Sequence, residues 1–365
     1  MQKILQICER HSLAKPIFSE NSLYCMKFGP VGELLKKFLC HEWLHANVIS
    51  SEIGVFPHYV SRSDAGHTIH DLKEAYEYVR NLNSGQLPFG VVVETPNLCA
   101  DKYFEKQQHI LDESEKYFYP KKCTFLKTFM FVAPSKATHF YYQWQRHRKM
   151  WWRKFSACPS RFVLSDVQNN EKNQSVHIQA NFPWGSQNVE TLSYWTTADQ
   201  DLAIRTVFEA KDGRKKVTPH IVESTLSVER AVFTFLCDAY DETAFAGLPR
   251  EVMRFHRKLA PFKLSFSASA SSSSAGEELN QLAVYLTKQT RDSGISTLLL
   301  PDLVKKSLES QFVRNDELGI PYTAVLNDTS LKNGIITLRN RDTTLKEQVH
   351  ISKLREYMEK ILKNY

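Results

Sequence analysis

Short apolar runs and helical periods alternate along the last third of the chain, from Lys258 onward. Short apolar runs bounded by turn residues predict strands, whereas apolar positions three or four residues apart predict helices. We therefore expect strands at 261–267, 295–300, 322–326 and 335–339, and helices at 277–292, after Pro301 and at 351–362. Strands that alternate with helices indicate a small α/β domain with a mixed sheet.

Two connections in this region carry a local signal of their own. The Ser/Ala run at 267–276 predicts a flexible loop before the first helix. Asn333-Gly334 lies between the last two expected strands, and this dipeptide is typical of a tight type I′ hairpin turn. Such a turn requires positive φ at Gly334, where a side chain would be strained.

The first 257 residues mix the same patterns without regular alternation. We expect helices at 32–49, 71–82 and 139–155, and strands at 90–94 and 124–132. This order is typical of an α+β domain. The change of pattern near Arg257 predicts two domains, residues 1–257 and residues 258–365.

Composition and charge narrow the class of protein. Of the 365 residues, 42% are apolar and 24% are charged, which suffices for a packed core and excludes global disorder. No apolar run approaches the roughly 18 residues of a membrane span, so we expect none. The 47 Lys and Arg exceed the 40 Asp and Glu by 7, which permits a nucleic-acid partner. The seven cysteines are scattered singly, which favours free thiols over a disulfide framework or a thiolate zinc site.

The sequence HEWLH at 41–45 matches the H-E-x-x-H zinc motif. On a helix its two histidines share one face, where they can bind Zn²⁺ while the glutamate activates water. The extended form of the motif is not met, because Val48 and Ser51 occupy the positions of its Gly and its third ligand. We therefore expect no metal site. Glu42 falls on the apolar side of the helix, so it should have a hydrogen-bond or charge partner.

The segment 141–154, YYQWQRHRKMWWRK, interleaves aromatic residues with five bases and contains no acid. Such a mixture suits contact with nucleic acid. We expect Arg146, Arg148 and Lys149 to contact DNA phosphates. The alternative is an amphipathic helix whose tryptophans pack in the core while its bases are solvated.

A second basic group, KDGRKK at 211–216, occupies an expected turn between strands. Lys211, Arg214, Lys215 and Lys216 are candidates for phosphate contact, and a solvated loop is the alternative. Neither basic segment contains a motif that reads bases, so we expect little sequence preference.

Several segments, in order along the chain, resemble class II glycyl-tRNA synthetases. They are FGPVGELLKKFLCHEW from Phe28, LPFG from Leu87, WQRHRKMWWRKF from Trp144, NFPWG from Asn181 and DGRKKVTP from Asp212. The same segments, with LAPFK from Leu259 and LRNRDTTLKE from Leu338, are similar to a related family, the accessory subunits of mitochondrial DNA polymerase gamma. The resemblance extends over nearly the whole chain.

The resemblance to the accessory subunits implies an inactive class II synthetase-like α+β domain followed by an anticodon-binding-like α/β domain. It implies a non-catalytic processivity factor that needs no cofactor and acts in the mitochondrial matrix, in the nucleoid. Such a factor binds the catalytic subunit of the polymerase and strengthens its hold on double-stranded primer–template DNA. We expect the second domain, with Gly334 at its turn, to dock on the polymerase.

An active aminoacyl-tRNA synthetase is the alternative that the other resemblance implies. Such an enzyme needs an Arg in its second motif to hold the α-phosphate of ATP, and no Arg occurs between Asn81 and Gln145. Its third motif needs glycines, which let the backbone approach ATP, followed by an Arg. Arg230 is present, but no Gly occurs from Arg214 to Ala246. We therefore expect no adenylation.

Two features depart from the accessory subunits. Only about forty residues separate the first long helix from Leu87, too few for the helical insert that builds the vertebrate homodimer, so we expect no dimer of that kind. MQKILQICERH at the start already resembles the first helix of the family. Mitochondrial targeting is therefore implied by the family and not by a presequence in this chain.

Overall fold

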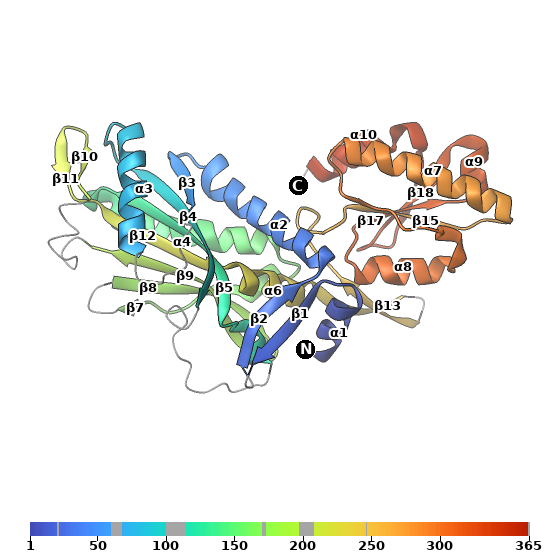
Figure 1. Cartoon of the computed structure of the whole chain (residues 1–365), viewed down its shortest axis with the longest axis horizontal. Coiled ribbons are helices and arrows are strands. Elements are labelled where there is room, and N and C mark those ends of the chain that lie inside the picture. Colours follow the sequence, from blue (N-terminus) through green and yellow to red (C-terminus); the bar gives the residue numbers. More distant parts are fainter. Residues whose placement is uncertain are drawn as a thin grey trace.

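The computed structural model describes residues 1–19, 22–59, 68–99, 114–169, 173–196, 208–245 and 247–363. Figure 1 shows two parts side by side, each built on its own sheet, with the first part in blue to yellow and the second in orange to red. The apolar side chains divide in the same way. Two core clusters draw on residues up to Ala260, and a third draws on residues from Leu264 onward.

The first part is built on an eight-stranded sheet in the order β3-β4-β5-β12-β9-β8-β6, with β7 paired to β8. Only β3 and β4 run parallel among these neighbours. The strands are β3 (Val55–Tyr59), β4 (Phe89–Cys99), β5 (Lys122–Val132), β6 (Phe162–Leu164), β7 (Gln168–Asn169), β8 (Asn173–Phe182), β9 (Gly185–Trp195) and β12 (His220–Ser227).

Helices cover both faces of this sheet. One face carries the larger core, to which α1 (Gln2–Arg10), α2 (Pro30–Leu44), α4 (Pro134–Phe155) and α6 (Val228–Ala239) contribute. The other face carries α3 (Thr68–Leu82). Successive strand residues point to opposite faces. Accordingly Val92 and Met130 join the first core, while Val91 and Phe129 join the second.

Three two-stranded hairpins extend the first part. They are β1 (Ala14–Ser19) with β2 (Ser22–Phe28), β10 (Ala210–Asp212) with β11 (Lys215–Val217), and β13 (Tyr240–Phe245) with β14 (Leu248–Met253). Short helical turns lie at Glu115–Phe118 and Pro159–Arg161. In Figure 1 the β10–β11 hairpin projects at one end of the molecule, beside α3 and away from the second part.

The second part is a five-stranded mixed sheet in the order β16-β15-β17-β18-β19. Its strands are β15 (Leu264–Ala268), β16 (Thr297–Leu298), β17 (Tyr322–Leu326), β18 (Ile335–Asn340) and β19 (Lys346–His350). Its helices are α7 (Ser273–Asp292), α8 (Leu308–Glu317), α9 (Asp328–Asn333) and α10 (Ile351–Lys363), with a short turn at Leu303–Lys305 before α8. Figure 1 shows α8 on one side of this sheet and α7, α9 and α10 on the other. No helix in the described part of the chain is long and apolar enough to cross a membrane.

The helices expected from the sequence correspond to observed elements. The expected ranges 32–49, 71–82, 139–155, 277–292 and 351–362 match α2 with its π-helical extension His45–Ile49, then α3, α4, α7 and α10. The loop expected at 267–276 is wrong in its second half. There α7 begins at Ser273, because the Ser272 hydroxyl accepts a hydrogen bond from the Ala275 N–H at 3.2 Å and caps the helix.

The tight two-residue turn expected at Asn333-Gly334 is also wrong. A short helix, α9, separates β17 from β18, although the two strands pair antiparallel as expected. Asn327 and Ser330 form a capping box that starts α9, and Gly334 ends it at φ 72. Positive φ at Gly334 is therefore confirmed, but it serves a helix C-terminus and not a two-residue turn.

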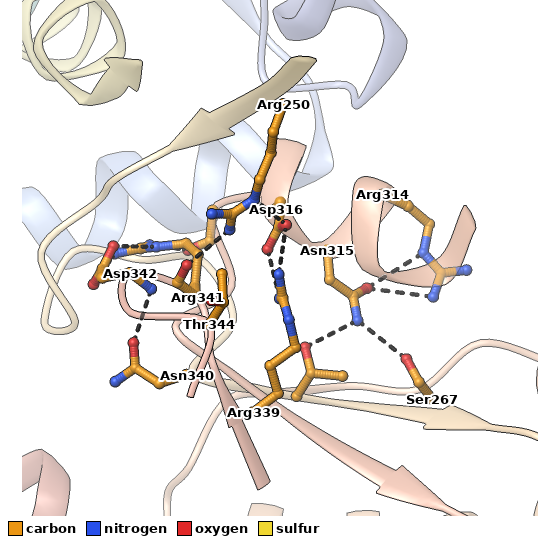
Figure 2. A network of polar contacts seen from close by, with 12 residues as sticks. Arg250, Ser267, Arg314, Asn315, Asp316, Arg339, Asn340, Arg341, Asp342 and Thr344 are labelled. Atoms are coloured by element: carbon orange, nitrogen blue, oxygen red, sulfur yellow. Dashed lines mark hydrogen bonds and ion pairs between the residues drawn. The ribbon is translucent and has the colours of Figure 1, made fainter. Parts of the chain in front are cut away.

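A polar joint connects the two parts (Figure 2). Asp316 at the end of α8 accepts hydrogen bonds from Arg250 of β14 at 2.7 Å and from both terminal nitrogens of Arg339 of β18 at 2.8 and 3.0 Å. The next residue, Glu317, accepts from Arg10 of α1 at 2.7 Å. Charge-assisted contacts of this kind fix geometry. They hold the second part in one orientation on the first.

Candidate nucleic-acid interface

The basic segment 211–216 forms the β10–β11 hairpin. Lys211 pairs with Lys216 and Asp212 with Lys215, which leaves Gly213 and Arg214 as a two-residue turn. Gly213 has φ +63, a conformation in which glycine is favoured at the first position of such a turn. The expectation of a basic turn between strands is therefore confirmed.

Backbone and side-chain hydrogen bonds anchor this hairpin to the chain that follows α3. The Lys211 N–H donates to the Gly85 carbonyl at 2.7 Å, and the Leu87 N–H donates to the Lys211 carbonyl at 3.0 Å. The Gln86 amide donates to the Gly213 carbonyl at 3.2 Å. At the root of the hairpin, the Tyr76 hydroxyl donates to the Glu209 carbonyl at 3.0 Å. The basic group is therefore held in place and is not a loose loop.

All four bases of the hairpin are exposed. One of them, Lys216, forms an ion pair with the Glu209 carboxylate at 2.8 Å. This hydrogen bond and the nearby charge hold the pKa of Glu209 below its usual range. Exposed ion pairs contribute little stability, so the bases are not needed for folding.

The second basic segment lies on α4, and its tryptophans face inward as the alternative for this segment requires. Trp144, Trp151 and Trp152 are 8%, 4% and 0% exposed and join the larger core. Arg146 is exposed and Lys149 is half-buried on the outer side of the helix. These two remain candidates for phosphate contact.

Arg148 cannot contact phosphate, and its assignment to DNA is corrected. Its side chain is fully buried, and its guanidinium donates to the two carboxylate oxygens of Glu190 at 2.7 and 3.2 Å and to Asn47 at 3.1 Å. The helical spacing carries this signal, because position 148 lies four residues from Trp144 and from Trp152.

Glu190 on β9 is the centre of a buried network beneath α4. Besides Arg148, it accepts hydrogen bonds from the Trp152 indole at 2.6 Å and from the Ser224 hydroxyl at 2.8 Å. A buried carboxylate is tolerated when it is paired and its oxygens are satisfied, and both conditions hold here. This network fixes α4 on the sheet and is structural.

The structure does not bring the two basic groups together. The hairpin packs beside α3, where Phe208 and Ala210 join the core on that face of the sheet. The helix α4 belongs to the core on the opposite face. A single straight DNA duplex lying on one face of the sheet therefore contacts one group and not both.

Comparisons with known proteins show which families this chain resembles. Residues 270–361 match the anticodon binding domain family. Over 231 residues the chain is 35% identical to DNA polymerase subunit gamma-2 of Mus musculus, an alignment that covers 60% of this chain and 49% of that protein. Over 252 residues it is 30% identical to the mitochondrial DNA polymerase subunit gamma-2 of Drosophila melanogaster, covering 66% of this chain and 67% of that protein.

The chain belongs to the DNA polymerase gamma-2 family. Glycine–tRNA ligases are further relatives. That of Chlorobaculum tepidum is 26% identical over 238 residues, which cover 62% of this chain and 48% of the ligase. This relationship agrees with the α+β class II synthetase-like fold and the anticodon-binding part. The chain spans about half the length of the vertebrate gamma-2 proteins it matches.

In this gamma-2 family member, Arg230, the residue that we expected to correspond to the third-motif Arg, makes its hydrogen bonds within the protein. Arg230 is 6% exposed and donates to the carbonyls of Phe118 at 2.9 Å and Asn188 at 2.5 Å. Its guanidinium also stacks over the Tyr119 ring, 4.5 Å from the ring centre. Burial lowers the pKa of Arg230 to about 10. Arg230 therefore links α6 to the turn at Glu115–Phe118 and to β9.

The HEWLH segment of the gamma-2 family member joins α2 to the connection between the two parts. Glu42 lies 3.7 Å from Lys258 Nζ and 3.8 Å from His41 Nδ1, which confirms that it has a charge partner. Lys263 donates to the carbonyls of Lys258 at 2.8 Å and Ala260 at 2.6 Å, and burial lowers its pKa to about 7. No group of three His, Cys, Asp or Glu side chains that could hold a metal occurs within the described ranges.

Proposed function

We propose that this chain is a non-catalytic accessory subunit that raises the processivity of a mitochondrial DNA polymerase. It binds the catalytic subunit and strengthens the hold of the complex on double-stranded primer–template DNA. The observation that carries the proposal is the membership of the gamma-2 family, whose relatives are named as subunits of DNA polymerase. The exposed, anchored basic hairpin supports the contact with DNA.

The proposal assigns no adenylation chemistry to the synthetase-like part. Adenylate formation depends on positive charge fixed around the phosphates of ATP. The second-motif Arg is missing from the sequence between Asn81 and Gln145, and Arg230 donates to backbone carbonyls. An active glycyl-type tRNA synthetase is the second candidate, favoured only by the 26% identity to a glycine–tRNA ligase.

The basic hairpin would bind the DNA backbone without reading sequence. Each Lys or Arg that neutralises a phosphate releases about one counterion, so binding weakens steeply as salt rises. A net charge of only +7 predicts modest affinity for the chain alone. Beside the catalytic subunit, the linked sites act at a high effective concentration, so a weak contact suffices.

Residues 258–365 would form the part that docks on the catalytic subunit, with residues 1–257 as the other domain. The outer face of α7 supports a protein partner, since its adjacent Val284 and Tyr285 are 55% and 56% exposed. Exposed apolar side chains next to each other mark interaction surfaces more often than single ones do. Gly334 keeps the end of α9 and the start of β18 in the shape that this docking part requires.

Action in the mitochondrial matrix, in the nucleoid, is part of the same proposal; the names of the relatives support the mitochondrion. The expectation of no vertebrate-type homodimer also stays a prediction. It rests on the segment from 51 to 86, of which residues 60–67 lie outside the described residues. Light scattering of the pure chain tests it, and a stable dimer through this segment would contradict it.

Duplex DNA binding as a function of salt tests the role of the hairpin. The test variant replaces the four hairpin bases with Ala, at Lys211, Arg214, Lys215 and Lys216. The control variant makes the same change of charge on α10, at Lys353, Arg355, Lys360 and Lys363. We expect the hairpin variant to bind more weakly, with a log–log salt slope shallower by about one for each phosphate that it no longer neutralises. If both variants match the wild type, the hairpin is a solvated loop.

A further inference from the structure

A recess of about 320 Å³ lies between the C-terminal end of α3 and the basic hairpin. Arg80 and Asn81 line it from α3, Ser84 from the following turn, and Glu209, Lys211 and Lys216 from the hairpin and its root. Three cations and one carboxylate therefore surround one small space. Their formal sum is positive.

Arg80 is held in this recess and does not extend freely into solvent. It is half-buried, its guanidinium lies 6.0 Å from the centre of the Tyr76 ring, and its Nη1 lies 3.5 Å from the Glu209 carbonyl oxygen. Tyr76 is itself fully buried and fixed to the same carbonyl. An Arg held by an aromatic ring loses little further freedom when it binds a phosphate.

The opposite wall is also fixed. The Lys211 backbone is hydrogen-bonded on both sides to the chain after α3, at Gly85 and Leu87. Lys216 pairs directly across the hairpin from Lys211. The cations on the two walls therefore face one space from elements far apart in sequence, since Arg80 and Glu209 are separated by 129 positions.

Glu209 is the one acid among the described residues that line the recess, and in the free protein it forms an ion pair with Lys216. Its carboxylate lies 2.8 Å from Lys216 Nζ, and both side chains are exposed, at 50% and 76%. An exposed pair of this kind is weak and exchanges partners readily. A phosphate entering the recess competes with Glu209 for Lys216.

We infer that this recess is a binding site for one backbone phosphate of DNA. Arg80, Lys211 and Lys216 bind the phosphate, whereas Glu209 weakens binding because it competes for Lys216. The inference rests on the proposed DNA-binding function and deepens it, since it adds a residue outside the hairpin and a built-in competitor. Arg favours phosphate because its planar fork donates two hydrogen bonds at once. Arg214 and Lys215 are exposed and do not line the recess, so they are not part of this phosphate site.

Fluorescence anisotropy of a labelled DNA duplex, measured over a series of salt concentrations, tests the inference with three variants. Arg80→Gln removes the cation of α3. Glu209→Gln removes the competing charge at constant shape. Arg355→Gln is the matched control on α10, where the side chain is 63% exposed. Thermal unfolding of each variant checks that its fold is intact.

We expect Arg80→Gln to weaken binding about three- to tenfold and to lower the salt slope by about one. Glu209→Gln should tighten binding, a gain that misfolding cannot imitate. Arg355→Gln should match the wild type. The inference is overturned if Arg80→Gln leaves the affinity and slope unchanged, or if Glu209→Gln weakens binding.

The fourfold hairpin variant separates this failure from a failure of the proposed function. If the fourfold variant loses affinity while Arg80→Gln does not, the hairpin binds DNA and the recess is not a phosphate-binding site. If neither variant differs from the wild type, the DNA-binding function itself fails. The same series with a structured RNA is the remaining arm: effects of Arg80→Gln on RNA and none on DNA would also overturn the inference.

Discussion

Replacing Asp316 with Asn should destabilise the chain through the joint between its two parts. Asp316, Arg250 and Arg339 have side chains that are 3%, 11% and 7% exposed, and the one carboxylate pairs with both guanidinium groups. Asn keeps the shape but removes the charge, and its amide nitrogen faces a guanidinium that can only donate. The two buried cations would then be without the carboxylate that pairs with them (Figure 2).

Breaking a buried ion pair by removing one partner costs about 3–5 kcal/mol, so we expect the free energy of unfolding to fall by about that amount. For a chain of 365 residues such a loss lowers Tm by about 5 °C. Chemical denaturation measures the free energy, and calorimetry measures Tm. The matched control is Asp302→Asn, because Asp302 is 53% exposed and pairs only with the exposed Lys305 among its described contacts. The control should change stability by less than about 0.5 kcal/mol.

A second measurement asks whether the joint acts as a unit. Arg250→Gln and Asp316→Asn share one contact, so the double variant should lose clearly less than the sum of the two single losses. A loss below about 1 kcal/mol for Asp316→Asn, equal to that of Asp302→Asn, would refute the reasoning. The carboxylate would then be dispensable, and the orientation of the two parts would depend on other contacts.

Three further predictions follow from single residues and from the missing synthetase motif. Gly334→Ala should lower the free energy of unfolding by about 1 kcal/mol or more, since Gly334 has φ +72 and a Cβ would lie 2.6 Å from His350 Nε2. Gly294→Ala, at φ +77 with open space around it, should lose less, because it has the backbone strain without the clash. Denaturant curves measure both losses, and a larger loss for Gly294→Ala would contradict the prediction. The pKa of His256 is lowered to about 4, chiefly by burial and then by neighbouring bases, so the unfolded chain binds a proton that the folded chain rejects between pH 6.5 and 4. Stability is therefore lost as pH falls through this window. Between pH 7 and pH 5 the free energy of unfolding of the wild type should fall by about 1–2 kcal/mol more than that of His256→Asn. Urea titrations at the two pH values measure this, and an equal fall for the two proteins would contradict it. Finally, glycine-dependent exchange of pyrophosphate into ATP should be undetectable, and measurable exchange would reinstate the synthetase alternative.

Much of the local structure can be predicted from the sequence, because helices are specified by nearby residues. The spacing of apolar positions predicts α2, α4, α7 and α10 within a few residues, and Asp212-Gly213 marks the turn of the basic hairpin. The capping of α9 also has a local signal, Asn327 followed three residues later by Ser330. The Asn333-Gly334 dipeptide that follows is a stronger signal, and it predicts a hairpin turn instead of the helix α9.

The candidate site can be predicted only in part, because it depends on contacts between distant segments. Helical spacing places Arg148 beside the tryptophans of α4, but it does not reveal its partner Glu190, which lies 42 residues away on β9. Arg80 carries no sequence signal at all, since it joins the hairpin only through the packing of α3 beside it. The same limit explains why sequence alone does not place the two basic groups on opposite faces of the sheet.

The length of DNA made in one binding event is the most direct test of the proposed function. The catalytic subunit of a mitochondrial DNA polymerase extends a labelled primer on a long single-stranded template, with excess unlabelled trap DNA and raised salt. Addition of this chain should lengthen the products, and the variant lacking the four hairpin bases should lengthen them less at the same occupancy of the catalytic subunit. Products of unchanged length, at a concentration where the two proteins co-purify, would contradict the account.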